Sequence, residues 1–407
     1  MSLALRLDFR MMRALGARMA PFWMMGLALV WWVEAGARAA EPAPIRIRVR
    51  VGQELSAVRI RGFDLRWFGA SVSPRRWDQM TEWGLRCPGR RVEAVQVGGV
   101  AKFHAPGRLR VDTPAGFLHW EGRPFRESLT VIADGRGHCQ VVNHLDLEKY
   151  LDGLVNSEFS SAWAEGAVEA QIIAARTYAL HQIREAVGKP GRMFDVESSV
   201  RDQVYEGSAK EDWRASRLVE RTRGLVLAVK HGGRNEPLKA FYHSTCGGTT
   251  ELPQKVWGRG FPGFRKRVAC PYCRVSPKFQ WSWEAKAGDL QKLAPQADPA
   301  SIRLLVSSVD PEGRATRLVL RWTEKGRTRD RQVSPVEFRN RVGSTTVLSA
   351  RFRVQELEGG GVRLDGRGYG HGVGLCQWGA KVMGEQGKAA EEILRHYYPA
   401  AEIRKLW

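Results

Sequence analysis

Glu158 lies directly before the longest helical pattern of the sequence. Beyond it, apolar residues recur at steps of three and four, which predicts an amphipathic helix; these residues are Ala167, Val168, Ile172, Ala175, Tyr178 and Ala179. We place Glu158 in the short loop before this helix, with Ser160 or Ser161 as the N-cap and Glu165 near the positive helix end. A carboxyl group held there can be desolvated and its pKa retuned, as a proton donor requires. A capping carboxylate at the helix start is the alternative interpretation.

Two pairs of residues further along have the spacing of metal knuckles. His243 and Cys246 form H-x-x-C, and Cys270 and Cys273 form C-x-x-C. Each pair fixes two ligands on one tight turn, and nitrogen and sulfur ligands suit tetrahedral zinc. Four protein ligands close the shell, so the predicted zinc is structural. The alternative is oxidation, with disulfides among these cysteines or with Cys376.

The region before Glu158 reads as β-strands. Residues 45–140 contain short alternating runs such as IRIRVRV, bounded by glycine, proline or aspartate. Cys87 and Cys139 are its only cysteines, and they form either a disulfide or two buried thiols. We expect a β-rich region over residues 41–124, followed by core positions that lead toward the glutamate: Phe125, Leu129, Val131 and Ile132.

The region after the central helix mixes strands with short helices. We expect a helix over residues 214–223, strands at 225–230 and 238–245 joined by a turn, and a strand-rich subdomain near 275–365 with a helix at 334–342. A glycine-rich loop, GRGYGHGVG, then leads into two helical patterns closed by Pro399. This order predicts an α+β fold whose parts frame an elongated substrate groove past Glu158.

Composition sets the protein class. With 407 residues, 43% of them hydrophobic and 26% charged, the chain is globular and long enough for two or three domains. A formal net charge of +21 attracts polyanions such as nucleic acid, anionic lipid or an acidic cell-envelope polymer. The sequence contains no recognition-helix, zinc-finger or RNP-type motif, so nucleic acid is not an expected partner.

Residues 1–40 resemble an export signal. Arginines precede an apolar run over residues 19–33, which is shorter than the roughly 20 residues of a membrane-spanning helix. The tripeptide Ala37-Arg38-Ala39 then supplies the small-x-small pattern of a cleavage site. This segment is either a cleaved signal peptide or an uncleaved anchor, and an anchor would be the chain's contact with a membrane. Both place the protein in the periplasm or cell envelope.

Four dense segments stand out between residues 125 and 407. They are YLDGLVNSEFSSAW with GAVEAQIIAARTYAL after it, DQVYEG, FYHSTCGGTTE with VWG after it, and GRGYGHGVGLCQWGAKVMGEQGKAAEEILRHYYP. In this order they resemble the SpoIID/LytB family of exported bacterial cell-wall proteins. The resemblance implies a SpoIID-like catalytic domain over residues 125–407, with a central helical segment that carries the catalytic acid.

The resemblance also implies an activity. It is that of a lytic transglycosylase, which cleaves peptidoglycan glycan strands freed of stem peptides and leaves 1,6-anhydro-N-acetylmuramyl ends. The acid of the family's S-E-[MF] motif is Glu158 here, acting first as acid and then as base. No cofactor is required for this catalysis. A second role associated with the family is that of a non-catalytic wall-binding protein that enhances a partner amidase.

Further residues are expected to bind the substrate. His371 lies in the glycine-rich loop, where backbone amides can approach a sugar closely. Other positions offer amide groups, aromatic faces or a cation, although each of them could instead serve packing or an ion pair: Arg176, Gln203, Tyr205, Tyr369 and Gln377. One departure from the family is Glu169, where relatives often have lysine. A second acid at this position raises the pKa of Glu158 if the two side chains approach, and otherwise is a surface residue.

Overall fold

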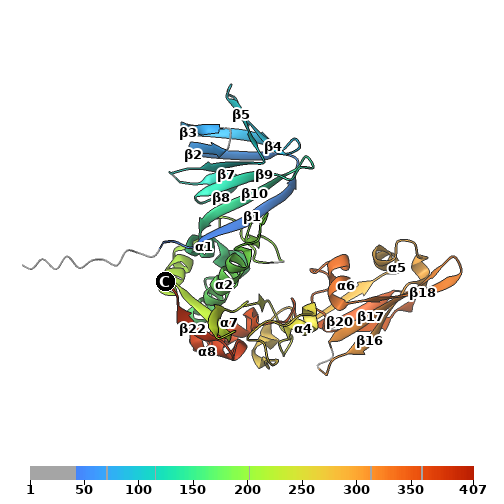
Figure 1. Cartoon of the computed structure of the whole chain (residues 1–407). Helices are drawn as coiled ribbons and strands as arrows, with labels where there is room; N and C mark the ends of the chain where they lie inside the picture. Colours follow the sequence, from blue (N-terminus) through green and yellow to red (C-terminus); the bar gives the residue numbers. More distant parts are fainter. Residues whose placement is uncertain (1–42, 70–71, 115, 201, 312–313, 359–360) are drawn as a thin grey trace, which may run out of the picture. The chain divides into compact units, whose positions relative to one another are not determined.

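The computed structural model describes residues 43–407 except 70–71, 115, 201, 312–313 and 359–360 (Figure 1). Residues from Pro44 to Trp407 form one compact unit of mixed α and β structure, as an α+β fold requires. The predicted signal peptide or anchor, residues 1–40, lies outside the described residues. Within the described ranges, no helix combines the length and apolar character needed to cross a membrane.

The N-terminal strands form a large sheet (Figure 1). Its strand order is β11-β1-β10-β9-β6-β2-β3-β4-β5, and β7 joins β2 to β8. Neighbouring strands are antiparallel, except that β11 runs parallel to β1. The bounds are β1 Arg46–Leu55, β2 Val58–Gly69, β3 Val72–Arg86, β4 Arg91–Gln96, β5 Lys102–Pro106, β6 Arg108–Asp112, β7 Leu118–Trp120, β8 Arg123–Phe125, β9 Ser128–Ala133, β10 Cys139–Asp146 and β11 Val196–Glu197.

Alternation along β1 explains how this sheet is anchored. Ile47 and Val49 are fully buried in the core, whereas the arginines that alternate with them, Arg46, Arg48 and Arg50, point the other way. Arg48 forms an ion pair with Asp195, and its Nη2 lies 2.6 Å from the carboxylate oxygen. The pattern IRIRVRV therefore supplies a core face and a charged face, as predicted.

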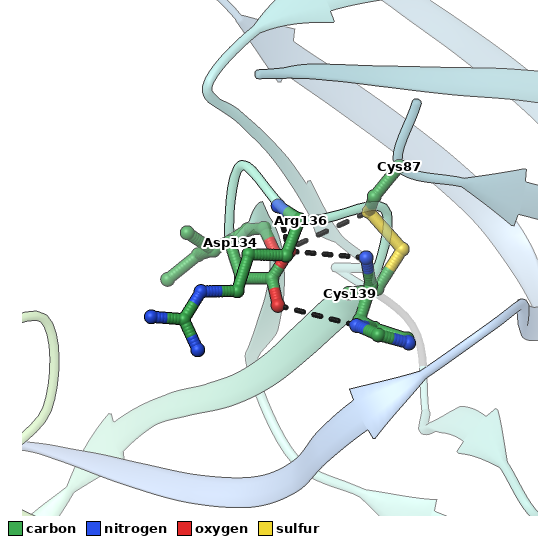
Figure 2. The surroundings of a disulfide bond; sticks show 6 residues. Cys87, Asp134, Arg136 and Cys139 are labelled. Atoms are coloured by element: carbon green, nitrogen blue, oxygen red, sulfur yellow. Dashed lines mark hydrogen bonds and ion pairs between the residues drawn. A yellow bond between two sulfur atoms is a disulfide. The ribbon is translucent and has the colours of Figure 1, made fainter. Parts of the chain in front are cut away.

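A disulfide joins Cys87, which follows β3, to Cys139 at the start of β10. Figure 2 shows the bond beside the turn between β9 and β10, where the Asp134 carboxylate accepts hydrogen bonds from the N–H groups of Arg136 and His138 at 2.7 and 3.0 Å. Of the two states left open by the sequence, the fold selects the disulfide. It ties non-adjacent strands of the sheet together.

Two helices follow the sheet directly. Helix α1 spans Leu147–Glu158 and α2 spans Glu165–Ala186. The predicted apolar positions of α2 are buried, but so are polar residues on its other sides, among them Arg176 and Thr177. Helix α2 is therefore a central helix with protein on most sides, contacting α1, α3, α7, α8 and β12, rather than an amphipathic surface helix.

A smaller sheet follows. Helix α3, Trp213–Arg221, confirms the predicted helix, and β12, Leu225–His231, pairs with β13, Arg234–Pro237, and with the C-terminal β22, Glu402–Lys405. The expected turn before residue 238 is thus largely strand, and the expected strand at 238–245 is reduced to β14, Tyr242–His243. Strand β14 pairs in parallel with β21, Leu375–Cys376, far along the chain.

The C-terminal segment packs around α2. It contains α7, Gln377–Glu385, and α8, Ala390–Tyr397, as predicted, and both contact α2. Before it, α4 spans Pro253–Trp257 and the 3₁₀ helix η1 spans Pro271–Val275. A hydrophobic core shared by these elements includes Ile173, Leu375 and Ile393, together with four cysteines.

The strand-rich segment has a hydrophobic core of its own, which includes Leu318, Phe338 and Leu364. Two small antiparallel sheets, β15-β20-β19 and β16-β17-β18, enclose it (Figure 1). Helix α6, Pro335–Val342, is capped by the Ser334 hydroxyl and confirms the predicted helix. The other bounds are β15 Gln280–Ala285, α5 Ala287–Leu290, η2 Gln291–Leu293, η3 Pro299–Ser301, β16 Arg303–Val309, β17 Ala315–Glu324, β18 Arg327–Val333, β19 Phe352–Glu356 and β20 Val362–Arg367.

Candidate active site

Glu158 is the last residue of α1, not part of a loop. Residue Asp146 caps the start of this helix, and its carboxylate accepts the N–H groups of Glu148 and Lys149. The predicted N-caps of α2 are wrong: Ala164 occupies that position without a side-chain hydrogen bond. Ser161 instead donates its hydroxyl to Asp212 at 2.7 Å and so fixes the segment between α1 and α2.

The environment of the Glu158 carboxyl group favours its neutral form. The residue keeps some exposed surface, but protein surrounds the carboxyl group, and this desolvation raises its pKa to about 7. The Val204 N–H donates to Oε1 and pulls the pKa in the opposite direction. Because the negative end of the α1 dipole also disfavours an anion here, position and burial act together.

Two tyrosines, the buried Tyr150 and the half-buried Tyr242, have hydroxyl groups near this carboxyl group. Burial first, and then the charge of Glu158, raise the pKa of the Tyr150 and Tyr242 hydroxyls well above the usual value. Both hydroxyls are linked to one amide, that of Gln203. The Tyr150 hydroxyl donates to Gln203 Oε1 at 3.1 Å, and Gln203 Nε2 donates to the Tyr242 hydroxyl at 3.0 Å.

Gln203 is therefore a positioning residue. It is fully buried, and Nε2 also donates to the Ala175 carbonyl of α2 at 3.3 Å. These bonds fix the backbone immediately before the Val204 N–H that contacts Glu158. The amide that we expected to bind substrate is used inside the protein.

Tyr205 and Arg176 are also buried. The Tyr205 hydroxyl donates to Asn143 Oδ1 at 3.0 Å. The Arg176 guanidinium has no exposed surface and pairs with Glu148 at 2.7 Å, while it also donates to the Val219 carbonyl at 3.1 Å. Of the two roles left open for Arg176, the structure supports the ion pair within the scaffold rather than a substrate contact.

The glycine-rich loop leads into α7, and the first residue of this helix contacts the backbone of Glu158. The Gln377 amide donates from Nε2 to the Glu158 backbone carbonyl at 3.4 Å. Gly374 makes this loop fit, because it has a φ of 73° and a Cβ there would lie 2.0 Å from the Phe241 carbonyl oxygen. Tyr369 is half-buried, and its backbone pairs with Thr245.

His371 is half-buried in the same loop. Its Nδ1 accepts the Val373 N–H at 3.0 Å, and its ring lies 5.1 Å from the Trp257 ring and 5.4 Å from the His243 ring. Desolvation holds the pKa of His371 well below its usual value, so the imidazole is neutral near pH 7. A neutral ring suits a hydrogen-bonding role better than an electrostatic one.

Half-buried aromatic side chains that we did not single out as substrate-binding lie next to Glu158 and Gln377. Phe159 follows the glutamate, and its ring lies 6.3 Å from that of Trp163. Trp163 in turn lies 6.2 Å from Trp378. Their sequence positions beside Glu158 and Gln377 were an available signal. Glu169, by contrast, pairs with Arg221 and does not contribute to the pKa of Glu158.

Four sulfur atoms form a second cluster. The thiols of Cys246, Cys270, Cys273 and Cys376 are buried, and their sulfur atoms all lie within 4.8 Å of one another. His243 is not the fourth member that we expected. Its Nδ1 lies 3.1 Å from the Val373 carbonyl, and Cys376 occupies the remaining corner.

Comparison with known proteins identifies the family of this chain. The family described as Stage II sporulation protein, SpoIID, matches residues 135–228. Stage II sporulation protein D of Bacillus subtilis is 30% identical over 279 residues, covering 65% of this chain and 76% of that protein. An uncharacterized protein of Brachyspira hyodysenteriae is 33% identical over 269 residues, 65% of this chain and 68% of that protein. The chain belongs to the SpoIID/LytB family, which confirms the resemblance found in the sequence.

A more distant relative has a different name. The Amidase enhancer of Bacillus subtilis is 25% identical over 302 residues, which cover 62% of this chain and 40% of that protein.

Proposed function

We propose that this protein cleaves peptidoglycan glycan strands as a lytic transglycosylase in the cell envelope, with Glu158 as its catalytic residue. The observation that carries the proposal is the carboxyl group of Glu158, whose pKa burial raises to about 7. Near neutral pH, both protonation states are then populated. A reaction that uses one residue as acid and later as base requires this balance.

The proposed reaction is balanced around one carboxyl group. Protonated Glu158 donates to the glycosidic oxygen as the bond from C1 of N-acetylmuramic acid to that oxygen breaks. The resulting carboxylate takes the proton of the C6 hydroxyl while O6 bonds to C1, which closes the 1,6-anhydro ring and restores the acid. No water is consumed, so a second carboxylate is not needed.

The surroundings of Glu158 support this one-acid scheme. Among the described residues, its pKa is shifted by burial and by the Val204 N–H, not by a second carboxylate. The acid that precedes Gln203, Asp202, is already bonded to the Tyr178 hydroxyl at 2.6 Å and to the Glu197 N–H at 2.9 Å. The proposed scheme therefore gives Asp202 no role in proton transfer.

Substrate binding is assigned to the exposed parts of the same region. The rings of Phe159, Trp163 and Trp378 offer apolar faces for sugars, and His371 offers a neutral hydrogen-bonding group in the glycine-rich loop. We propose that an elongated groove follows these residues past Glu158. The net charge of +21 suits an anionic wall, and strands without stem peptides would fit such a groove most simply.

Product analysis tests the proposal. Purified protein incubated with stem-free glycan strands should release products with 1,6-anhydromuramyl ends, detected by mass spectrometry. Glu158→Gln should lower the rate by at least about 100-fold, since general acid–base catalysis contributes that much or more. Glu220→Gln is the matched control, because Glu220 is an exposed residue of α3, and its rate should be unchanged. Wild-type protein that forms no anhydro ends, or a fully active Glu158→Gln, would refute the proposal.

A second function is favoured by the relative named Amidase enhancer. In this case the protein binds glycan strands and stimulates a partner cell-wall amidase without cleaving them itself. Strand binding and amidase stimulation would then survive Glu158→Gln. Loss of stimulation in parallel with loss of cleavage would favour the enzyme instead.

A further inference from the structure

We propose that Cys246, Cys270, Cys273 and Cys376 bind one Zn²⁺ ion in a closed tetrahedral site. All four thiols are almost completely shielded from solvent, and their sulfur atoms lie within 4.8 Å of one another. This ligand set differs from the sequence-based prediction, because Cys376 takes the place of His243. The site is independent of the cleavage reaction proposed for Glu158.

The sulfur separations fit a metal ion better than disulfides. The sulfur atoms of Cys246 and Cys273 lie 3.5 Å apart. Zinc–sulfur bonds of about 2.3 Å at tetrahedral angles place pairs of ligands roughly 3.8 Å apart. A disulfide needs about 2 Å between its sulfur atoms. In the same chain, Cys87 and Cys139 do form a disulfide, so the four thiols are arranged differently from a pair ready to oxidise.

The backbone around the sulfur atoms has the features of a ligand cradle. Cys246 opens a turn through Gly247 and Gly248, whose φ angles are 73° and 111°. The Gly248 carbonyl accepts the N–H of Cys270 at 2.8 Å, which joins this turn to the second pair of cysteines. Cys270 lies just before η1, and Cys273 lies within it, three residues further on. This spacing is that of a zinc knuckle.

Two polar groups that can donate hydrogen bonds lie next to the sulfur atoms. The Cys246 N–H donates to Cys376 Sγ at 3.3 Å, and the Tyr397 hydroxyl lies 3.1 Å from Cys270 Sγ. Donors of this kind stabilise thiolates and orient metal ligands. Close packing is also enforced by Gly379 of α7, where a Cβ would lie 2.7 Å from Cys270 Sγ and 1.9 Å from the Tyr397 hydroxyl oxygen.

Guanidinium groups support the first turn. Arg314 is buried and donates to the carbonyls of Cys246 at 3.2 Å and Thr249 at 3.0 Å. Arg351 donates to the Gly247 carbonyl at 2.7 Å. Four thiolates around Zn²⁺ carry a net charge of −2. Glu251 pairs with Arg314 and offsets part of its positive charge. The two guanidinium groups together still favour a negatively charged site.

The site connects distant parts of the chain near the candidate active site. Cys376 is the N-cap of α7, and the next residue, Gln377, donates to the Glu158 carbonyl. Leu375, on the other side, pairs with Tyr242, which belongs to the Gln203 network. With four sulfur ligands there is no open position for a substrate, so the zinc holds this wall in place and performs no chemistry.

Metal analysis of the full chain, purified without a metal-affinity tag, tests the inference. We expect one zinc per chain by mass spectrometry of the metal content. After denaturation in chelator without reductant, four thiols should react with an alkylating reagent while Cys87 and Cys139 remain linked. Iron in place of zinc, less than about half an equivalent of zinc, or additional disulfides would overturn the proposal.

Matched variants identify the ligands. Cys376→Ser should lose most of the bound zinc, whereas His243→Ala and the double variant Cys87→Ser/Cys139→Ser should keep it. If Cys376→Ser does not fold, titration of wild-type protein with a mercurial reagent should release one zinc as four thiols react. Retention of zinc by a folded Cys376→Ser, or its loss from His243→Ala, would refute this ligand set. Zinc content is measured without any activity assay, so this outcome is separate from that of the cleavage test.

Discussion

Helix α1 carries a glutamate near each end whose carboxyl group is surrounded by protein, and the two carboxyl groups have opposite surroundings. Glu148, in the first turn, receives the Arg176 guanidinium through two nitrogen atoms, at 3.0 and 2.7 Å. Glu158, the last residue, accepts one hydrogen bond from the Val204 N–H and has no cation among the groups that shift its pKa. The helix dipole favours a carboxylate at the first position and disfavours it at the second.

This contrast shows how one residue type serves two purposes. A buried carboxylate that is paired with a guanidinium holds elements together: Arg176 links α2 to Glu148 of α1 and to the backbone at Val219 and Leu225. A carboxyl group that is buried without a cation exchanges its proton near neutral pH instead. Substitutions at the two glutamates and among their neighbours test this division.

Glu148→Gln should have the largest effect on stability. It leaves the Arg176 guanidinium buried without its partner, which costs about 3–5 kcal/mol. Urea denaturation measures this change in the free energy of unfolding. The double variant Glu148→Leu/Arg176→Met should be more stable than the single variant, because no unpaired charge remains. A loss below about 1 kcal/mol for Glu148→Gln would contradict the scaffold role.

Glu158→Gln should change stability in the opposite direction. Because burial raises the pKa of Glu158 from 4.5 to about 7, the folded state binds a proton that the unfolded state releases between these values. Wild-type stability therefore falls as pH rises through this window, by on the order of 3 kcal/mol. Glutamine cannot ionise, so the free energy of unfolding of the variant should increase relative to that of wild type between pH 5 and pH 8. Equal pH dependence of the two proteins in urea denaturation would show that Glu158 titrates normally.

Gln203→Leu should affect the reaction more than the fold of the whole domain. It removes the amide that links Tyr150, Tyr242 and the backbone before Val204. We expect kcat for glycan cleavage to fall by roughly 10–100-fold, as for a displaced general acid. Weaker bonding of Val204 to the carboxylate should also move the pH–rate profile to higher pH. A fall in kcat with an unchanged profile would mean that Gln203 does not act through Glu158.

Trp378→Ala should have the smallest effect. Its ring is part of the aromatic group beside Glu158, and an aromatic contact contributes about 0.5–1.5 kcal/mol beyond its buried area. We expect KM for stem-free strands to rise roughly 3–10-fold with kcat little changed. Trp213→Ala, at an exposed tryptophan of α3, is the control and should leave KM unchanged. An unchanged KM in both variants would remove Trp378 from the proposed groove.

Much of the local structure could be predicted from the sequence. The alternation in residues 46–50, the long central helix and the Ser334-capped helix follow from spacing and capping chemistry within a few residues. The knuckle formed by Cys270 and Cys273 is equally local. Glu158 stood out because of its motif, although its position at the end of α1 rather than in a loop did not.

The residue types available for chemistry could be recognised along the chain: a glutamate in a family motif, a glycine-rich loop and cysteines in knuckle spacing. Which of these residues contact one another depends on the fold. It buried Arg176, Gln203 and Tyr205 in internal hydrogen bonds, and it brought Cys376 to the sulfur cluster where spacing had favoured His243. Spacing along a chain fixes neighbours three or four residues apart, whereas these contacts join residues that only the pairing of β14 with β21 and the packing of α2 place together.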